Sequence, residues 1–93
     1  MRKLVVIDLS SANTQLFESY ERKVIPLLSK YNGKLELSVR SIDGMTETHV
    51  LYFPDVEHFE AFISDPIRSA LKDELLQTGV TSTITDVESI DYT

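Results

Sequence analysis

The spacing of hydrophobic and polar residues changes several times along the chain, and four segments have the spacing of β-strands. Residues 3–9 form a nearly continuous apolar run, which is typical of a strand that is covered on both faces. Residues 34–42 alternate between apolar and polar side chains. Residues 46–53 and 80–90 are rich in β-branched and aromatic residues, which favour half-buried strands.

The segments between these strands have the spacing of helices. The first places its apolar residues on one helix face, at Leu16, Tyr20, Val24, Leu27 and Tyr31. Pro26 lies inside this pattern, so the helix should kink or start a new turn there. Asn32-Gly33 should end it, because both residues tolerate a positive φ. A second helical pattern begins after the capping residue Asp55, breaks at Asp65-Pro66 and ends at Gly79.

The order of these elements predicts a fold class. Alternation in residues 34–42 predicts that Leu35, Leu37 and Val39 share one face, opposite Glu36, Ser38 and Arg40. Asp43-Gly44 predicts a hairpin between the second and third strands. The order strand, helix, strand, strand, helix pair, strand is the βαββαβ order of a ferredoxin-like α+β fold. We therefore expect residues 1–93 to form one domain with a four-stranded antiparallel sheet and helices on one face.

Such a sheet leaves one face without helices, and the residues of the first strand indicate whether that face is polar or apolar. Residues 4, 6 and 8 would lie on one face and residues 5, 7 and 9 on the other, and both sets are largely apolar. An exposed apolar face usually marks an interface. We therefore expect a homodimer in which two open faces meet to form a dimeric α/β barrel.

Charge and composition exclude several classes of protein. The formal net charge is −6, so phosphate backbones and anionic membranes would be repelled, and we expect no nucleic-acid partner. The chain has no Cys, which excludes disulfides and thiol chemistry. No apolar run is long enough to span a membrane and no secretory signal is visible, so we expect no membrane partner and a cytoplasmic location.

His49 is the first candidate for chemistry. Strand alternation places it on one face with Glu47, Leu51 and Phe53. A histidine among apolar strand residues is suited to act as a general base near neutral pH. The alternative is a partly buried histidine with a purely structural role.

Asp8 and Arg40 form the second candidate group, because each places a charge on a predicted strand. If both face the barrel interior, they would form an ion pair or hold a polar ligand. The first and third strands are central neighbours in this fold, so Asp8 would also be able to orient His49. The alternative is a salt bridge at the dimer interface.

Three further residues are candidates for ligand binding. Tyr52 would line a pocket, Glu36 would face the open side with Arg40, and Tyr20 would lie in the core or at its rim. The other histidine, His58, should lie on the solvent side of its helix. Two histidines without a carboxylate constellation give no metal site, and three scattered glycines give no phosphate loop, so we expect no cofactor and no metal.

Several of these motifs also resemble a known superfamily. They are the Tyr20, Pro26-Leu27-Leu28 and Tyr31-Asn32-Gly33-Lys34 helix end, the Val50-Leu51-Tyr52-Phe53-Pro54 corner, and the Phe62 and Asp65-Pro66 helix break. The chain is similar to the dimeric α/β-barrel superfamily, which includes antibiotic-biosynthesis-type monooxygenases, EthD-like and YciI-like proteins, and most of all to a small bacterial family of unknown function within it. Asn32 stands where that family often has a second glycine.

The resemblance implies a fold more than a function. A His–Asp pair such as His49 and Asp8 resembles the sites suggested for some YciI-like proteins. Two functions stay open at this point. The chain is either a dimeric protein with a small-molecule cavity, or a cofactor-independent monooxygenase or isomerase acting on a small aromatic or polyketide-like substrate.

Overall fold

The computed structural model describes all 93 residues. The chain forms four strands and five helical segments, in the order β1 (Arg2–Asp8), α1 (Thr14–Val24), the 3₁₀ helix η1 (Ile25–Tyr31), β2 (Lys34–Arg40), β3 (Thr46–Tyr52), α2 (Val56–Ile63), α3 (Pro66–Ala70), α4 (Lys72–Thr78) and β4 (Thr81–Val87). This is the predicted order, with the second helical region divided into three short helices.

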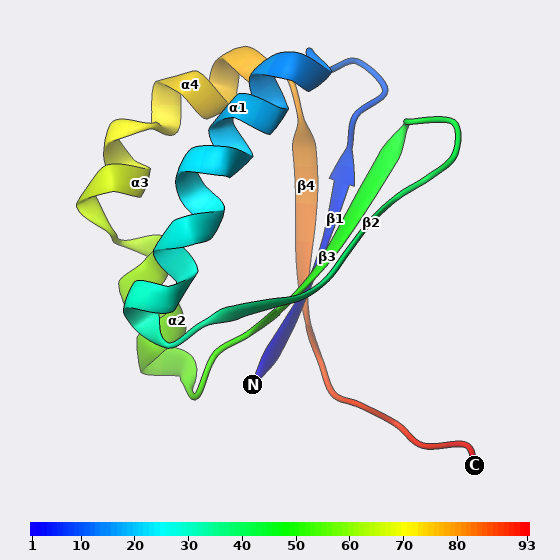
Figure 1. Ribbon diagram of the computed structural model, residues 1–93, viewed down its shortest axis with the longest axis vertical. Helices are drawn as coiled ribbons and strands as arrows, with labels where there is room; N and C mark the ends of the chain where they lie inside the picture. Colours follow the sequence, from blue (N-terminus) through cyan, green and yellow to red (C-terminus); the bar gives the residue numbers. More distant parts are fainter.

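The four strands form one antiparallel sheet in the order β2-β3-β1-β4. All helices lie on one side of the sheet, and the other side carries none (Figure 1). This arrangement confirms the predicted ferredoxin-like α+β fold. The central neighbours are β1 and β3, so their side chains decide what lies beneath the helices.

Pro26 divides the first helical region as predicted. The α-helix ends at Val24 and a 3₁₀ helix starts at Ile25, with proline in its first turn. Proline has no N–H to donate and its ring excludes a regular preceding turn, so a change of helix type removes the conflict. Together α1 and η1 run along the helix side of the sheet up to the start of β2 (Figure 1).

Asn32 and Gly33 end that region for two different reasons. Asn32 adopts the left-handed conformation, with φ of 56°, which an asparagine tolerates. Gly33 instead makes room, because a Cβ there would lie 2.8 Å from Cε1 of Phe53. Only one of the two residues therefore uses the expected freedom in φ.

The predicted faces of β2 were wrong for one of the three apolar residues. A β-bulge lies between Leu35 and Leu37, so Leu35 pairs with Leu51 on the helix side while Leu37 pairs with Val50 on the open side. A bulge adds one residue to one strand and therefore reverses every side chain after it. Leu37 and Val39 are consequently about half exposed.

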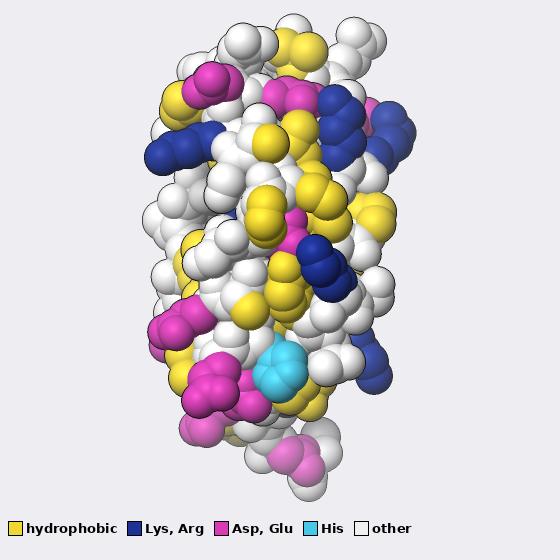
Figure 2. All heavy atoms as spheres, turned by 90° about the vertical axis from the view of Figure 1, so that its left-hand side faces the viewer, with side chains coloured by type: hydrophobic (Ala, Val, Ile, Leu, Met, Phe, Trp, Pro, Cys, Tyr) yellow, Lys and Arg dark blue, Asp and Glu magenta, His cyan; other side chains and the backbone are white.

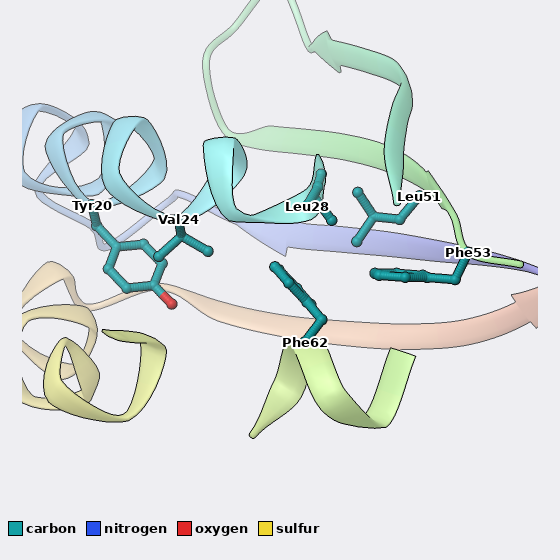
Figure 3. Packing of buried hydrophobic residues seen from close by; sticks show 6 residues of the cluster. All are labelled: Tyr20, Val24, Leu28, Leu51, Phe53 and Phe62. Atoms are coloured by element: carbon teal, nitrogen blue, oxygen red, sulfur yellow. The ribbon is translucent and has the colours of Figure 1, made fainter. Parts of the chain in front are cut away.

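The core lies between the sheet and the helices in two adjoining clusters. The larger one gathers side chains from α1, η1, β3 and α2, and Figure 3 shows them converging: Tyr20, Val24, Leu28, Leu51, Phe53 and Phe62. Ile7, Leu9 and Phe17 form the smaller one. Phe53 packs against Phe62 with ring centroids 5.5 Å apart, which fixes α2 against the end of β3.

A second set of apolar side chains faces outward on the helix layer. Figure 2 shows them running down the middle of this face between charged residues, and Ile63, Ile67 and Leu76 belong to it. No helix is long and apolar enough to cross a bilayer.

Candidate functional site

A cavity of about 120 Å³ lies between the helix side of the sheet and the helices. Thirteen of its 17 lining residues are hydrophobic, Tyr20 among them, and the other four are Glu21, His49, Arg68 and Ser82. An engineered cavity of about 150 Å³ with apolar walls is known to hold benzene. This cavity is therefore on the scale of a compact molecule rather than of a large cofactor.

His49 and Glu47 form the polar wall of the site on β3. They lie two residues apart, so strand alternation puts both side chains under the helices, where they are 5% and 8% exposed. Nε2 of His49 lies 2.7 Å from Oε2 of Glu47. The carboxylate therefore fixes the imidazole and leaves Nδ1 as the ring nitrogen without a close partner.

Arg40 extends this pair toward the surface. Its Nη2 lies 2.7 Å from Oε1 of Glu47, and its Nη1 donates to Oε1 of Glu18 at 3.0 Å. Hydrogen bonds to Glu47 and Glu18 raise the pKa of the Arg40 guanidinium, so it stays charged throughout. Glu47 is thus held between a permanent cation and His49.

Glu21 approaches the same histidine from α1. Its Oε2 lies 4.0 Å from Nδ1 of His49, on the side that faces the cavity. Burial raises the pKa of the Glu21 carboxyl, the positive potential of His49 and Arg68 lowers it, and the charge of Glu47 raises it further. The net direction of the pKa is upward, so this carboxyl is easier to protonate than a glutamate side chain in water.

Arg68 and Tyr20 also line the cavity. Nη1 of Arg68 donates to the carbonyl oxygen of Ile63 at 3.2 Å, and its guanidinium lies 4.8 Å from the centre of the Phe62 ring. Burial raises the pKa of the Tyr20 hydroxyl, and the positive charge of Arg68 partly offsets this. The Tyr20 phenol is therefore neutral and available as a hydrogen-bond donor.

The sequence-predicted residues do not all meet at this cavity. His49 and Tyr20 line it, and Arg40 reaches it through Glu47. Asp8 does not contact His49, because the residue of β1 that faces His49 is Val5. Asp8 is exposed on the open side, pairs with Thr46 and accepts a hydrogen bond from the backbone N–H of Ser10 at 2.9 Å.

The expected contacts of Asp8, Glu36 and Tyr52 are corrected in the same way. Arg40 pairs with Glu47 and Glu18, not with Asp8. Glu36 sits at the bulge and binds Arg2 at 2.6 Å, away from Arg40, and the Arg2 guanidinium lies 5.5 Å from the Tyr52 ring. A bulge in β2 and the alternation of β1 and β3 place these residues outside the helix-side cavity.

Three site residues were missed in the sequence. Glu47 carried a signal, since it shares a strand face with His49. Glu21 carried one too, because it lies four residues after Phe17 and three before Val24, both of which are buried. Arg68 lies in a helix of only five residues. Such a helix is too short for the spacing of its apolar residues to show which side is buried.

Asp65 is a buried carboxylate that belongs to the scaffold. It is 1% exposed, accepts hydrogen bonds from the Tyr31 hydroxyl and from Lys30, and caps α3 by accepting from the N–H of Ile67 at 2.7 Å. The hydrogen bond from Tyr31 is the main reason why the pKa of Asp65 falls to about 2. With hydrogen bonds to three partners and no place in the lining of the cavity, Asp65 holds η1 and α3 together.

The contact between His49 and Glu47 is suited to proton transfer. No group of three or more His, Asp or Glu side chains is arranged to hold a metal ion. A histidine held by a carboxylate beside a largely apolar cavity is the arrangement that a general base requires.

Comparison with known proteins supports the fold. No protein-family profile matches the chain, and no curated protein matches it in sequence. An uncharacterised NIPSNAP domain protein from Burkholderia xenovorans is similar in structure, with a TM-score of 0.67, 12% identity and 98% of both chains covered. A protein of the antibiotic biosynthesis monooxygenase type from Nitrosomonas europaea has a TM-score of 0.69 at 12% identity, over 94% of this chain and 98% of that one.

A third similar structure is RPA0582, a protein of unknown function from Rhodopseudomonas palustris. Its TM-score is 0.68 at 17% identity, over 97% of this chain and 83% of that one. These likenesses confirm the predicted resemblance at the level of the ferredoxin-like fold. At such low identity they carry no residue roles to this chain.

Proposed function

We propose that this protein binds a compact, largely apolar molecule in the cavity beneath its helices and that His49 exchanges a proton with it. The observation that carries the proposal is the 2.7 Å contact between Nε2 of His49 and Glu47. It fixes the ring so that Nδ1 is the nitrogen left for a ligand. Apolar walls around one oriented polar group are typical of small-molecule sites.

The size and lining of the cavity limit which molecules could bind in it. About 120 Å³ suits a molecule of the size of a single small ring. Mostly hydrophobic walls favour such a ring over a sugar or a nucleotide. The base-containing site also favours the enzymatic alternative, a cofactor-independent isomerase or monooxygenase, and the antibiotic biosynthesis monooxygenase type of one structural neighbour is in keeping with this.

We further propose that two copies of the chain pair through the open face of the sheet. No helix covers this face (Figure 1). Leu37 and Val39 lie on it about half exposed, beside Val50 and Thr48 on the neighbouring strand. Pairing with a second copy would remove this apolar surface from water without blocking the cavity on the other side of the sheet.

Binding is tested by titrating the protein with benzene and following backbone amide signals by NMR. Leu75 lines the cavity, so Leu75→Phe should fill it and abolish the shifts of cavity residues. Leu76→Phe is the matched control, because Leu76 is 71% exposed and does not line the cavity. Equal binding by both variants, or no binding by the unaltered protein, would refute the cavity as a ligand site.

The proton-exchange part is tested separately. Native mass spectrometry of the purified protein would detect a co-purified small molecule, whose mass gives the substrate class. His49→Gln keeps a hydrogen-bonding side chain of similar size but removes the base. Turnover of the identified molecule should fall by at least 100-fold, the lower range for loss of a general base. Unchanged turnover would leave a binding protein without base catalysis.

A further inference from the structure

Arg68 carries the one buried side-chain nitrogen or oxygen atom in the chain that has no hydrogen-bond partner, its Nε. Elsewhere on the guanidinium, Nη1 donates to the carbonyl oxygen of Ile63, and Cζ lies 4.8 Å from the centre of the Phe62 ring. Buried polar atoms almost always have a partner, so an unpaired donor in a fixed position calls for a functional explanation.

The position of Arg68 indicates what its unpaired donor could bind. Arg68 lines the helix-side cavity and also a surface pocket of about 310 Å³. Tyr20, Ile63 and Leu75 line both as well. Arg68 therefore stands in the wall between the cavity and the surface pocket, within reach of a molecule in either one.

The charges around the cavity indicate which kind of acceptor fits. Glu21 and Arg68 are the two lining groups with formal charges of opposite sign, and His49 is the remaining titratable base. Glu47 is matched by Arg40 behind the wall. A carboxylate ligand would meet Glu21 as a like charge, whereas a neutral ligand with one oxygen acceptor leaves the balance intact.

We propose that Arg68 binds the carbonyl oxygen of the ligand, and that the ligands of this site are compact neutral carbonyl compounds with a proton on the adjacent carbon. This inference rests on the proposed function and names the substrate class for it. The guanidinium supplies a fixed donor where negative charge would develop on the oxygen. His49 supplies the base.

The step balances within the site. Nδ1 of His49 takes the proton from the carbon next to the carbonyl group, and the electron pair of that C–H bond forms the C=C bond of an enolate. The carbonyl π pair moves onto oxygen, beside the Nε–H of Arg68. Return of the proton to carbon or to oxygen yields the ketone or its tautomer, and neither an oxidant nor a cofactor is consumed.

The test compares cyclopentanone with benzene, which has the same number of heavy atoms but no acceptor. Affinities come from NMR titration, and the rate of deuterium incorporation next to the carbonyl comes from mass spectrometry in D2O. The variants are Arg68→Met, which removes the donor, and Arg68→Lys, which keeps the charge. Arg22→Met is the control, since Arg22 is exposed on α1 and does not line the cavity.

The unaltered protein should bind cyclopentanone more tightly than benzene and accelerate its deuteration. Arg68→Met should lose about tenfold in cyclopentanone affinity and in exchange rate while keeping its benzene affinity, as expected for one hydrogen bond to a charged donor. Arg68→Lys should fall between, because lysine keeps the charge without the planar donor. Arg22→Met should match the unaltered protein.

The outcomes separate the two proposals. If benzene and cyclopentanone bind equally to the unaltered protein, Arg68 does not select a carbonyl compound and the inference is wrong, while the cavity remains a binding site. If Arg68→Met weakens both probes alike, Arg68 has a structural role only. If neither probe binds the folded, unaltered protein, the proposed function fails and this inference fails with it.

Discussion

Nε2 of His49 lies 2.7 Å from Oε2 of Glu47, two residues earlier on the same strand. The two side chains are neighbours because every second residue of a strand faces the same way. The pair is buried beneath the helices, and Arg40 anchors it from the adjacent strand. A base oriented in this way by secondary structure alone needs no loop to hold it.

Removing Glu47 should destabilise the protein. Glu47→Ala leaves His49 and Arg40 without their shared partner, and Arg40 retains partial contact with water and with Glu18. We expect the free energy of unfolding to fall by about 2–3 kcal/mol in urea denaturation. Glu36→Ala removes an exposed ion pair with Arg2 and should leave stability essentially unchanged. Equal effects of both substitutions would contradict a buried network.

Glu21 should make the protein less stable as the pH rises. Burial raises the pKa of its carboxyl above the ordinary value of 4.5. Its favourable contribution is therefore fully present below pH 4.5 and is lost as the pH rises through the raised value. Glu21→Gln, which cannot ionise, should be more stable than the unaltered protein at pH 8 and equal to it at pH 4. Thermal unfolding across this range measures the difference, and a Gln variant that is less stable at pH 8 would contradict the sign.

Asp65 should show the opposite dependence. Its pKa falls from 3.8 to about 2, so the stability that its charge provides is present above pH 3.8 and is lost as the pH falls through about 2. Asp65→Asn keeps a side chain able to cap α3 while removing the charge that Tyr31 and Lys30 bind. The variant should be less stable than the unaltered protein at pH 7, with a gap that closes toward pH 2. A gap independent of pH would assign the effect to packing.

Gly33 should not tolerate a side chain. A Cβ at this position would lie 2.8 Å from Cε1 of Phe53, which is fully buried. Gly33→Ala should cost about 1–3 kcal/mol of unfolding free energy, the usual range for overpacking a core. Gly44→Asn is the comparison, since Gly44 has a φ of 76° with open space around it and asparagine accepts that conformation. If both variants are equally stable, Phe53 can move aside.

If two copies pair as proposed, the protein should have the mass of a dimer in solution, and a substitution on the open face should reduce it to that of a monomer. Light scattering after size-exclusion chromatography should give twice the chain mass of 10.6 kDa. Leu37→Glu places a charge on the open face, where Leu37 is about half exposed in the single chain, so it should produce a folded monomer. Leu76→Glu on the helix side should leave the dimer intact. A monomer for the unaltered protein at micromolar concentration would overturn the proposal.

The order of the elements and the faces of the strands could be predicted from the sequence wherever the alternation of apolar and polar residues continues without interruption. The alternation of residues 46–53 placed His49 with Leu51 and Phe53, and the structure buries all three. Pro26, Asp55 and Gly79 acted through local backbone chemistry, so the breaks that they predict are found. These signals need only the nearest neighbours in the chain.

The faces of β2 were not accessible in this way. The bulge between Leu35 and Leu37 adds a residue opposite β3, and its position depends on what the two strands must accommodate together. Because one extra residue reverses the alternation, Leu37 and Val39 face the open side. Alternation within a single strand carries no information about such an insertion.

The sequence by itself determined the ferredoxin-like order of elements and the histidine on a buried strand face. The tertiary structure decided the composition of the site. It brought Glu21 and Arg68 from separate helices to the cavity and placed Asp8 on the far side of the sheet. The physical reason is that periodicity fixes the direction of a side chain relative to its own element. Which elements face one another is set by packing across the whole chain, and contacts between residues distant in sequence follow from that packing alone.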